Sequence, residues 1–346
     1  MSRLVLLALS ALLTACAAEN DSADPEPTDT ELQSFAWATR SGDAPLVIAH
    51  RGASGERPEH TMAAYVLALE QGADVLEPDL QMSSDGQLIV RHDPYLSTST
   101  DIASRPEFAD RMVERNGRLD WWVFDFTAAE LRSLTARQVF EDRDQSYNDQ
   151  YPVLTFIDFL EFVSEQEILC QCTLAIEPEI KVPQLYINAG FDPGGALLEA
   201  LEIHDLTGED APVVIQSFDA QFLEDFAPRT LLPLAMLYAG PDEPGYNADG
   251  LSLDEIARFA DGIGAYKGVL INADGSSTGY LETAHAAGLD VHVWTVRADR
   301  NPITGETVEE ELEALYRLGV DAVFTDHVDL AVQVKERLAS GTLDHP

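Results

Sequence analysis

The chain has 346 residues, of which 45% are hydrophobic and 24% are charged, a composition that excludes a disordered or fibrous protein. Acidic residues outnumber basic ones by 61 to 21, so the formal net charge is -40. A polyanionic surface repels nucleic acid and anionic lipid, which argues against both as partners. The acidity is typical of a solvated surface suited to a saline habitat, and the length fits one α/β barrel.

Residues 1–16 predict a lipoprotein signal peptide. Arg3 precedes an apolar run too short to span a bilayer comfortably, and the run ends in an L-T-A-C sequence at Cys16. This ending resembles a bacterial lipobox with Cys16 lipidated; the alternative is an ordinary signal peptide with a coincidental cysteine. Residues 17–44 are acidic and contain proline, which predicts a flexible tether. We therefore expect a cell-envelope protein that meets the membrane only through Cys16, on the periplasmic side of the outer membrane or at the cell surface.

Strand-like and helix-like segments alternate from Leu46 onward. Apolar runs predict eight strands, at residues 46–50, 75–80, 174–180, 213–218, 234–238, 261–265, 291–296 and 321–326. Between most of them lie helix-like segments, at residues 61–71, 155–165, 196–204, 220–226, 253–260, 280–287 and 308–317. Eight such units predict a (β/α)8 TIM-type barrel over residues 45–346, and a doubly wound open sheet is the alternative.

Two stretches interrupt this alternation. Asp85-Gly86, flanked by alternating residues, predicts a β-hairpin rather than a crossover. Residues 95–150 lack a clear period, which predicts an insertion after the second barrel strand that shapes the site entrance. Trp121-Trp122 in this insertion either grips a substrate or packs the insertion onto the barrel.

Two cysteines remain after Cys16. Cys170 and Cys172 lie two residues apart, near the upper separation limit for a disulfide in an extended chain. They are either two buried thiols or a strained bridge, and no function is assigned to them.

Charged residues occur near the carboxyl ends of three predicted strands. A charge in a buried strand is unfavourable unless it is paired or bound to metal, and these strand ends form the catalytic face of a barrel. The residues are His50, Arg51, Glu77, Asp79, Glu177, Glu179 and Lys181. Glu77 and Asp79 share one face of a strand because they are two apart, as do Glu179 and Lys181.

The hairpin returns His92 to the same end of the sheet, opposite Asp79. Three carboxylates without a nearby thiolate indicate a hard divalent cation, Ca²⁺ or Mg²⁺. Arg51, Lys181 and such a cation form a pocket suited to phosphate, and His50 and His92 have the near-neutral pKa that general acid–base chemistry needs. Together these groups predict phosphodiester cleavage.

The segments "HRGASGERPEHT", "LEPDLQMSSDGQLIVRHD" and "EPEIKVP" resemble the glycerophosphodiester phosphodiesterases, particularly the periplasmic, calcium-dependent type. The resemblance covers most of residues 46–326 and implies a barrel related to the phosphatidylinositol phospholipases. It implies one divalent cation, with Ca²⁺ favoured over Mg²⁺. It assigns site residues as follows: catalytic His50 and His92; metal ligands Glu77, Asp79 and Glu179; substrate-binding Arg51, Lys181, Glu59 and Trp294. Glu177 is not among the residues that the resemblance assigns, and it is expected to support the site or the edge of the core.

The implied reaction is hydrolysis of a small glycerophosphodiester, such as glycerophosphocholine or glycerophosphoethanolamine, to glycerol 3-phosphate and an alcohol. The nucleophile is either water or the glycerol 2-hydroxyl. The alternatives are a phospholipase D-like enzyme of lysophospholipids or sphingolipids, and a lipid-anchored binding protein without catalysis. We expect His60 at a helix start, and His292 on a strand, facing the helices; Phe218 and Trp294 line the pocket or fill the barrel. The oligomeric state stays open.

Overall fold

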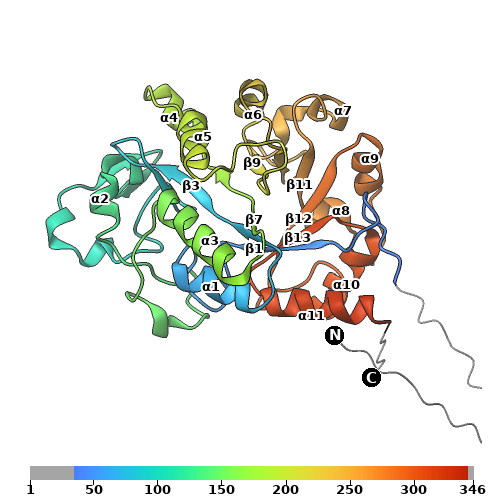
Figure 1. Cartoon of the computed structure of the whole chain (residues 1–346). Coiled ribbons are helices and arrows are strands. Elements are labelled where there is room, and N and C mark those ends of the chain that lie inside the picture. Colours follow the sequence, from blue (N-terminus) through green and yellow to red (C-terminus); the bar gives the residue numbers. More distant parts are fainter. Residues whose placement is uncertain (1–34, 342–346) are drawn as a thin grey trace, which may run out of the picture. The chain divides into compact units, whose positions relative to one another are not determined.

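The computed structural model describes residues 35–341 (Figure 1). Cys16, the predicted signal peptide and the predicted tether up to residue 34 lie outside the described residues. Residues 35–44, expected at the end of the tether, instead pack against the barrel. The ring of Trp37 lies 6.2 Å from that of Tyr316, and the Arg40 guanidinium contacts Asp290 at 2.5 Å. Their aromatic and ion-pair contacts explain why this part is not a free tether.

The described strands form the predicted (β/α)8-type barrel. Two predicted strands are each divided by a proline, Pro78 or Pro178, because proline has no N–H for the ladder. The barrel strands are β1 (Leu46–His50), β2 (Val75–Glu77), β3 (Asp79–Met82), β7 (Ala175–Ile176), β8 (Glu179–Ile180), β9 (Ile215–Ser217), β10 (Leu234–Tyr238), β11 (Gly262–Tyr266), β12 (Asp290–Val296) and β13 (Ala322–Thr325).

The parallel pairings close into a ring. β1 pairs with β2 on one side and with β13 on the other. β2 pairs with β7, and their continuations beyond the two prolines, β3 and β8, also pair. From β8 the pairing runs through β9, β10, β11 and β12 to β13. Because β2 with β3 and β7 with β8 each count as one strand, eight strands surround the interior.

Alternate residues of the strands fill the barrel interior. Ile48, Val75 and Phe324 form one buried cluster there. The expectation that His292 faces the helices is wrong: its Nδ1 lies 2.9 Å from Glu177 Oε1. β12 and β7 are not neighbours in the sheet, so this contact crosses the interior, where each side chain satisfies the other.

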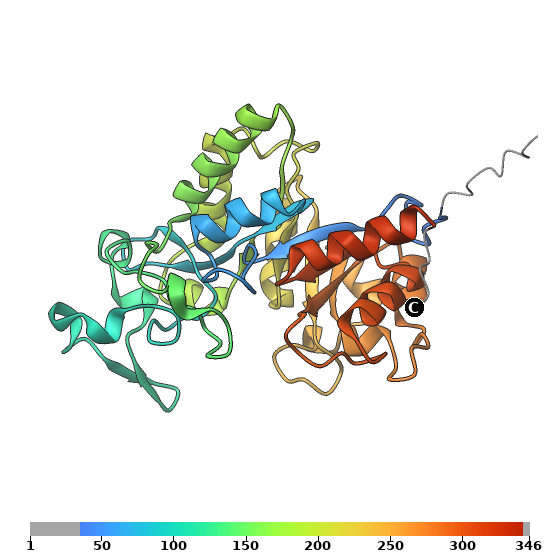
Figure 2. The same cartoon turned by 90° about the horizontal axis from the view of Figure 1, so that it is seen from below.

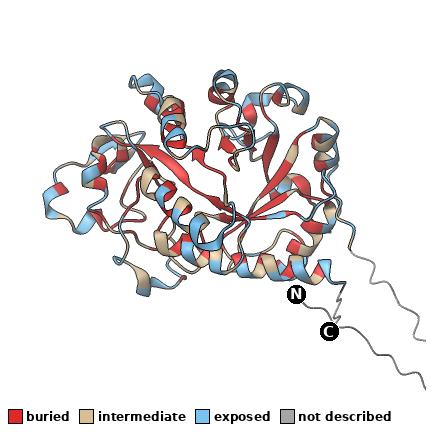
Figure 3. Ribbon diagram, viewed as in Figure 1, coloured by how far each residue is buried: buried red, intermediate tan, exposed pale blue. Residues whose placement is uncertain are grey.

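Helices surround the strands, and their buried faces turn toward the sheet (Figures 1 and 3). They are α1 (Met62–Glu70), α3 (Phe156–Cys170), α4 (Pro183–Asn188), α5 (Pro193–Ile203), α6 (Ala220–Phe226), α7 (Leu253–Ile256), α8 (Lys267–Leu270), α9 (Tyr280–Ala286), α10 (Val308–Leu318) and α11 (Val328–Ala339), with short 3-10 turns η5 (Ala227–Arg229) and η6 (Ala248–Gly250). α4, α8 and α11 were not predicted from the sequence; α11 buries Val328, Ala331 and Val334. Within residues 35–341, no helix has the length and apolar character needed to cross a membrane.

The predicted hairpin is present. β3 pairs antiparallel with β4 (Leu88–Val90) around the turn at Asp85-Gly86, where Gly86 has φ 80°. Beyond β4 the Arg91 N–H donates to the Asp79 carbonyl at 2.7 Å. This contact brings His92 back to the carboxyl end of β3, as the sequence predicts.

Residues 91–154 form a layer with its own small core beside the barrel (Figure 2). Its elements are η1 (Ile102–Ser104), η2 (Pro106–Phe108), β5 (Val113–Arg115), β6 (Arg118–Asp120), η3 (Val123–Asp125), α2 (Ala128–Leu131) and η4 (Gln145–Tyr147). The indole N–H groups of Trp121 and Trp122 donate to the carbonyls of Phe108 and Val113. Both tryptophans therefore pack the insertion rather than grip a substrate.

Cys170 and Cys172 are joined by a disulfide at the end of α3. Both residues are exposed, so the alternative of two buried thiols is wrong. The bridge lies outside the cavity described below.

Candidate active site

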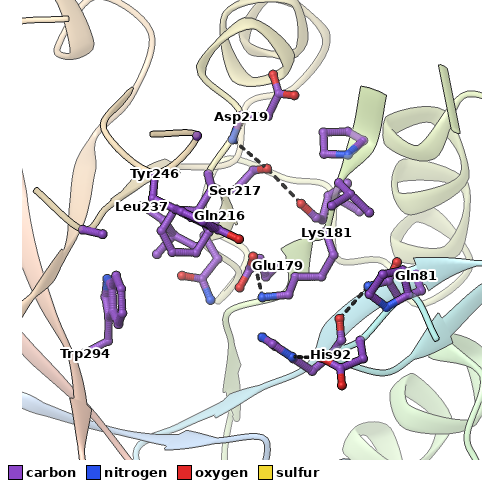
Figure 4. Close-up of a pocket in the computed structure, with 18 of the residues that line it drawn as sticks. Gln81, His92, Glu179, Lys181, Gln216, Ser217, Asp219, Leu237, Tyr246 and Trp294 are labelled. Atoms are coloured by element: carbon purple, nitrogen blue, oxygen red, sulfur yellow. Dashed lines mark hydrogen bonds and ion pairs between the residues drawn. The ribbon is translucent and has the colours of Figure 1, made fainter. Parts of the chain in front are cut away.

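A cavity of about 1060 Å³ opens at the carboxyl ends of the barrel strands. Figure 4 shows Glu179 and Lys181 at its centre, His92 on one side and Trp294 on the other. Of the predicted site residues, seven line this cavity: His50, Arg51, Glu77, His92, Glu179, Lys181 and Trp294. Asp79 and Glu59 lie directly behind them and contact Arg51.

Glu77, Asp79 and Glu179 form a buried carboxylate cluster. One oxygen from each residue lies within 4.8 Å of the other two. The pairing of Asp79 with Glu179 in the β3–β8 register places these two carboxylates side by side. Lys181 Nζ lies 2.9 Å from Glu179 Oε1 and 3.4 Å from Asp79 Oδ1, so its charge partly balances the cluster.

Ionisation of all three carboxylates in this cluster is unfavourable without a bound cation. Burial, with the negative charge of Asp79, raises the pKa of Glu77 well above its usual value, and burial raises the pKa of Glu179 to about 8. Burial would also raise the pKa of Asp79, but the charges of Lys181 and Arg51 hold it well below its usual value. Among the described residues, buried Asp79 Oδ1 accepts no hydrogen bond, although it has the ion-pair contact with Lys181. Three carboxylates that can act as metal ligands, and a buried oxygen that accepts no hydrogen bond, fit a hard divalent cation.

His60 holds Asp79 from behind. Its Nε2 lies 2.9 Å from Asp79 Oδ2, and its Nδ1 lies 2.9 Å from the Tyr65 hydroxyl. His60 stands directly before Thr61, the N-cap of α1, so its expected place at a helix start is confirmed. Its contact with Asp79 was not predicted, because a histidine at a helix start carries no sequence signal of the residue that it contacts across the barrel rim.

Arg51 is fixed between acidic residues. Its Nη1 donates to Glu59 at 2.7 Å, its Nε lies 3.2 Å from Asp79, and its backbone N–H donates to Glu77 Oε2 at 2.8 Å. Arg51 has φ 61° and Gly52 has φ 79°, a sharp left-handed turn after β1. A Cβ at Gly52 would lie 2.7 Å from the carbonyl carbon of Ala64, so only glycine lets the loop pass so close to α1. This turn aims the guanidinium into the cavity.

His50 forms a dyad with Asp326, a residue directly after β13. His50 Nδ1 lies 2.6 Å from Asp326 Oδ1, and Asp326 Oδ2 accepts from Arg143 and Arg297 at 2.6 and 2.7 Å. Burial and the charge of Arg51 lower the pKa of His50 to about 3, although Asp326 opposes them. Sequence reasoning missed Asp326, whose position at the end of the last strand was an available signal. Arg143 lies in the insertion, and no sequence signal pointed to its contact with Asp326.

His92 forms a second dyad. Its Nδ1 lies 2.7 Å from Asp93 Oδ1, and Asp93 Oδ2 accepts from the Thr98 hydroxyl at 2.7 Å. Burial and the charges of Arg51 and Lys181 lower the pKa of His92 to about 4. Both pKa values lie below the near-neutral range expected from the sequence, because burial and neighbouring positive charges disfavour the imidazolium, so both imidazoles are neutral near pH 7. A carboxylate at each Nδ1 favours a proton on that nitrogen, which leaves Nε2 as the proton acceptor.

Trp294 and Phe218 line the cavity rather than only fill the barrel. The Trp294 indole N–H donates to the Gly264 carbonyl at 2.6 Å, which fixes the ring on the β11 side of the opening. Phe218 lies between this ring and Lys181, with its centre 5.6 Å from Trp294 and 5.9 Å from Lys181 Nζ. These rings form an apolar wall opposite the ionic part of the site.

Comparison with known proteins points to one family. The model of the "Glycerophosphoryl diester phosphodiesterase family" matches residues 50–330. A glycerophosphodiester phosphodiesterase of Haemophilus influenzae is 31% identical, over 96% of this chain and 98% of the relative. A protein of the same name from Treponema pallidum is 30% identical, over 83% of this chain and 91% of the relative.

Solved structures share the fold. A crystal structure of a putative glycerophosphoryl diester phosphodiesterase from Silicibacter pomeroyi superposes with a TM-score of 0.68 at 22% identity, covering 85% of this chain and 94% of that one. A phosphodiesterase of Oleispira antarctica, solved with its product sn-glycerol-3-phosphate, superposes with a TM-score of 0.60 at 22% identity, covering 86% and 99%. By the extent of the family match and of the Haemophilus likeness, the chain belongs to the glycerophosphoryl diester phosphodiesterase family.

Proposed function

We propose that this protein hydrolyses small glycerophosphodiesters to glycerol 3-phosphate and an alcohol, with one divalent cation, Ca²⁺ in preference to Mg²⁺. The observation that carries the proposal is the pair of imidazole–carboxylate dyads, His50–Asp326 and His92–Asp93. They lie beside three clustered carboxylates and the positively charged side chains of Arg51 and Lys181. The product complex of the Oleispira relative supports the product class. The comparisons do not favour a lysophospholipid or sphingolipid substrate.

The cation would be held by Glu77, Asp79 and Glu179, where it would neutralise charge on the phosphoryl oxygens. Arg51 and Lys181 line the same cavity and contribute two further positive charges for the phosphate. Both side chains are held by carboxylates, so they need little reorganisation as charge develops.

The two histidines divide the proton transfers. One neutral imidazole accepts the proton of the attacking oxygen at Nε2, while its Nδ1–H stays bonded to Asp326 or Asp93. The other takes up a proton at Nε2 when the anionic diester binds, because the phosphate offsets the positive charge of Arg51 that lowers its pKa. As an imidazolium, stabilised by its carboxylate, it then donates that proton to the leaving alkoxide. The attacking oxygen is either water or the glycerol 2-hydroxyl, and detection of a cyclic phosphate during turnover distinguishes them.

Alanine variants of the two histidines test this assignment. Loss of one acid–base group should lower kcat by about 10²- to 10⁴-fold for His50→Ala and for His92→Ala. The matched control is His204→Ala, because His204 contacts Ser164 and does not line the cavity. Near-normal release of glycerol 3-phosphate by either cavity variant, with the control also unchanged, would refute the assignment.

We also propose that Cys16 carries a lipid that anchors the enzyme in the bacterial envelope, on the periplasmic side of the outer membrane or at the cell surface. The support is the L-T-A-C sequence and the acidic stretch that follows it. A Cys16→Ser variant should lose incorporated fatty acid and move to the soluble fraction. Unchanged membrane association of that variant would contradict the proposal.

A further inference from the structure

One segment of the insertion packs onto the loop that follows the first barrel strand. We call this segment, residues 138–147, the strap. Gln138 Nε2 donates to the carbonyls of Ser54 and Arg57 at 3.0 and 3.2 Å, and the Arg57 guanidinium lies 3.9 Å from the centre of the Tyr147 ring. Ser54 and Arg57 both belong to the loop between β1 and α1. The strap therefore holds that loop by its backbone and by a side chain.

The strap also binds the loop between β12 and α10. Arg300 Nη1 lies 2.8 Å from Asp142 Oδ2, and the Arg300 guanidinium lies 4.4 Å from the centre of the Phe140 ring. From the strap, Arg143 Nε donates to Asp299 Oδ2 at 2.6 Å. These two loops leave different barrel strands, β1 and β12, and one short segment of the insertion bridges them.

Hydrogen bonds within the insertion fix the shape of the strap. The Gln138 N–H donates to the side-chain oxygen of Asn148 at 2.7 Å, which joins the two ends of the strap. The Gln145 side-chain amide donates to the carbonyls of Phe140 and Arg143 at 2.8 and 2.9 Å. These bonds hold the backbone from which the Arg143 side chain projects, and this lowers the entropy cost of keeping that side chain in one place.

Arg143 connects the strap to His50 in two ways. Its Nη2 donates to Asp326 Oδ2 at 2.6 Å, and its Nη1 donates to the Ser54 carbonyl at 3.0 Å. Both partners contact His50, since Asp326 Oδ1 lies 2.6 Å from His50 Nδ1 and the Ser54 hydroxyl donates to the His50 carbonyl at 2.8 Å. One guanidinium thus contacts the carboxylate beside the imidazole and the loop residue that holds the His50 backbone.

Two arginines donate to the same oxygen of Asp326, but they differ in exposure. The Arg297 side chain is 27% exposed and lines the cavity, whereas that of Arg143 is 4% exposed. An ion pair shielded from water is stronger than one open to solvent. The planar fork of donors also lets Arg143 hold its three partners at once. Because Oδ2 is bound in this way, Oδ1 stays turned toward His50.

We propose that Arg143 is a positioning residue: it fixes the Asp326 carboxylate that orients the His50 imidazole, so that the insertion completes the active site. The inference rests on the proposed diesterase function, in which His50 transfers a proton at Nε2. Arg143 does not line the cavity, so it acts through Asp326 rather than on the substrate. A carboxylate that is free to turn holds the Nδ1–H less firmly, and the imidazole then spends less time in the reactive orientation.

The test compares Arg143→Met with Arg300→Met. Arg143→Met should lower kcat for glycerophosphocholine by about 10- to 100-fold and leave KM nearly unchanged. Arg143→Lys keeps the charge without the fork of donors, so its kcat should lie between those of the wild type and Arg143→Met. Arg300 binds the same strap through an exposed ion pair and does not contact Asp326, so Arg300→Met should keep kcat within about twofold.

A spectroscopic measurement reports the position of the imidazole without turnover. The proton that His50 Nδ1 shares with Asp326 lies in a short hydrogen bond, so its NMR signal should lie far downfield, and the His50→Ala variant identifies that signal. The signal should shift or broaden in Arg143→Met and stay unchanged in Arg300→Met. Melting temperatures check folding, and where Arg143→Met does not fold, Arg143→Lys takes its place in both measurements.

The outcomes separate this inference from the proposed function. If the wild type releases no glycerol 3-phosphate from any glycerophosphodiester, the proposed function fails. If the wild type is active, three results overturn only the positioning role of Arg143. These are a wild-type kcat in the Arg143 variants, an unchanged downfield signal in those variants, and an equal loss of kcat in Arg300→Met.

Discussion

Replacing Asp326 with asparagine tests how the chain positions His50. The substitution keeps the size of the side chain but removes the charge that His50 Nδ1 contacts at 2.6 Å. A hydrogen bond to a charged group contributes about 1.5–3 kcal/mol, and each 1.36 kcal/mol is tenfold in rate. We therefore expect kcat to fall by about 10- to 150-fold in Asp326→Asn, and by more where the amide NH₂ turns toward Nδ1 and forces the proton onto Nε2.

The control is Asp299→Asn. Asp299 contacts Arg143, the same arginine that contacts Asp326, but it does not contact His50. Initial rates of glycerol 3-phosphate release across substrate concentration separate kcat from KM, and thermal unfolding of both variants checks folding. A positioning role predicts a lower kcat with little change in KM for Asp326→Asn alone. Equal losses in both variants, or a kcat within twofold of the wild type for Asp326→Asn, would refute the reasoning.

Three further predictions follow from burial and charge. The pKa of His92 is lowered to about 4 and that of His50 to about 3, so both histidines stay neutral in the folded protein as the pH falls. The unfolded chain binds these protons first, so the free energy of unfolding should decrease from about pH 6.5 downward. Chemical denaturation measured against pH should show a weaker decrease in the His50→Ala and His92→Ala variants. Because the pKa of Glu179 is raised to about 8, Ca²⁺ binding at pH 7 should release protons, and calorimetry in buffers of different ionisation enthalpy should detect them; no release would contradict a carboxylate ligand there. Gly52→Ala should destabilise the fold by about 1–3 kcal/mol, since its Cβ would lie 2.7 Å from Ala64, and an unchanged melting temperature would show that the loop gives way.

The sequence predicted the parts of the fold that depend on local patterns. Eight apolar runs became the barrel strands, and Asp85-Gly86 became the hairpin turn, because period and turn chemistry act over a few residues. α11 was missed although its buried residues have helical spacing, since the motif similarity ended before it.

The site was predictable only where its residues lie on strands. Glu77, Asp79 and Glu179 meet because strand alternation and register decide where their side chains point. His292 was placed on the wrong face because its partner, Glu177, lies 115 residues away in sequence. Arg143 reaches Asp326 through the fold of the insertion, which no local pattern describes.

Release of glycerol 3-phosphate from glycerophosphocholine, before and after metal removal, is the most direct test of the central claim. The account predicts turnover with Ca²⁺, loss of turnover after complete chelation, recovery on adding Ca²⁺ back, and weaker recovery with Mg²⁺. A Glu179→Gln variant should need more Ca²⁺ for half-maximal rate, because one of three carboxylate ligands is gone. Turnover that is indifferent to chelation, or no release of glycerol 3-phosphate under any of these conditions, would contradict the account.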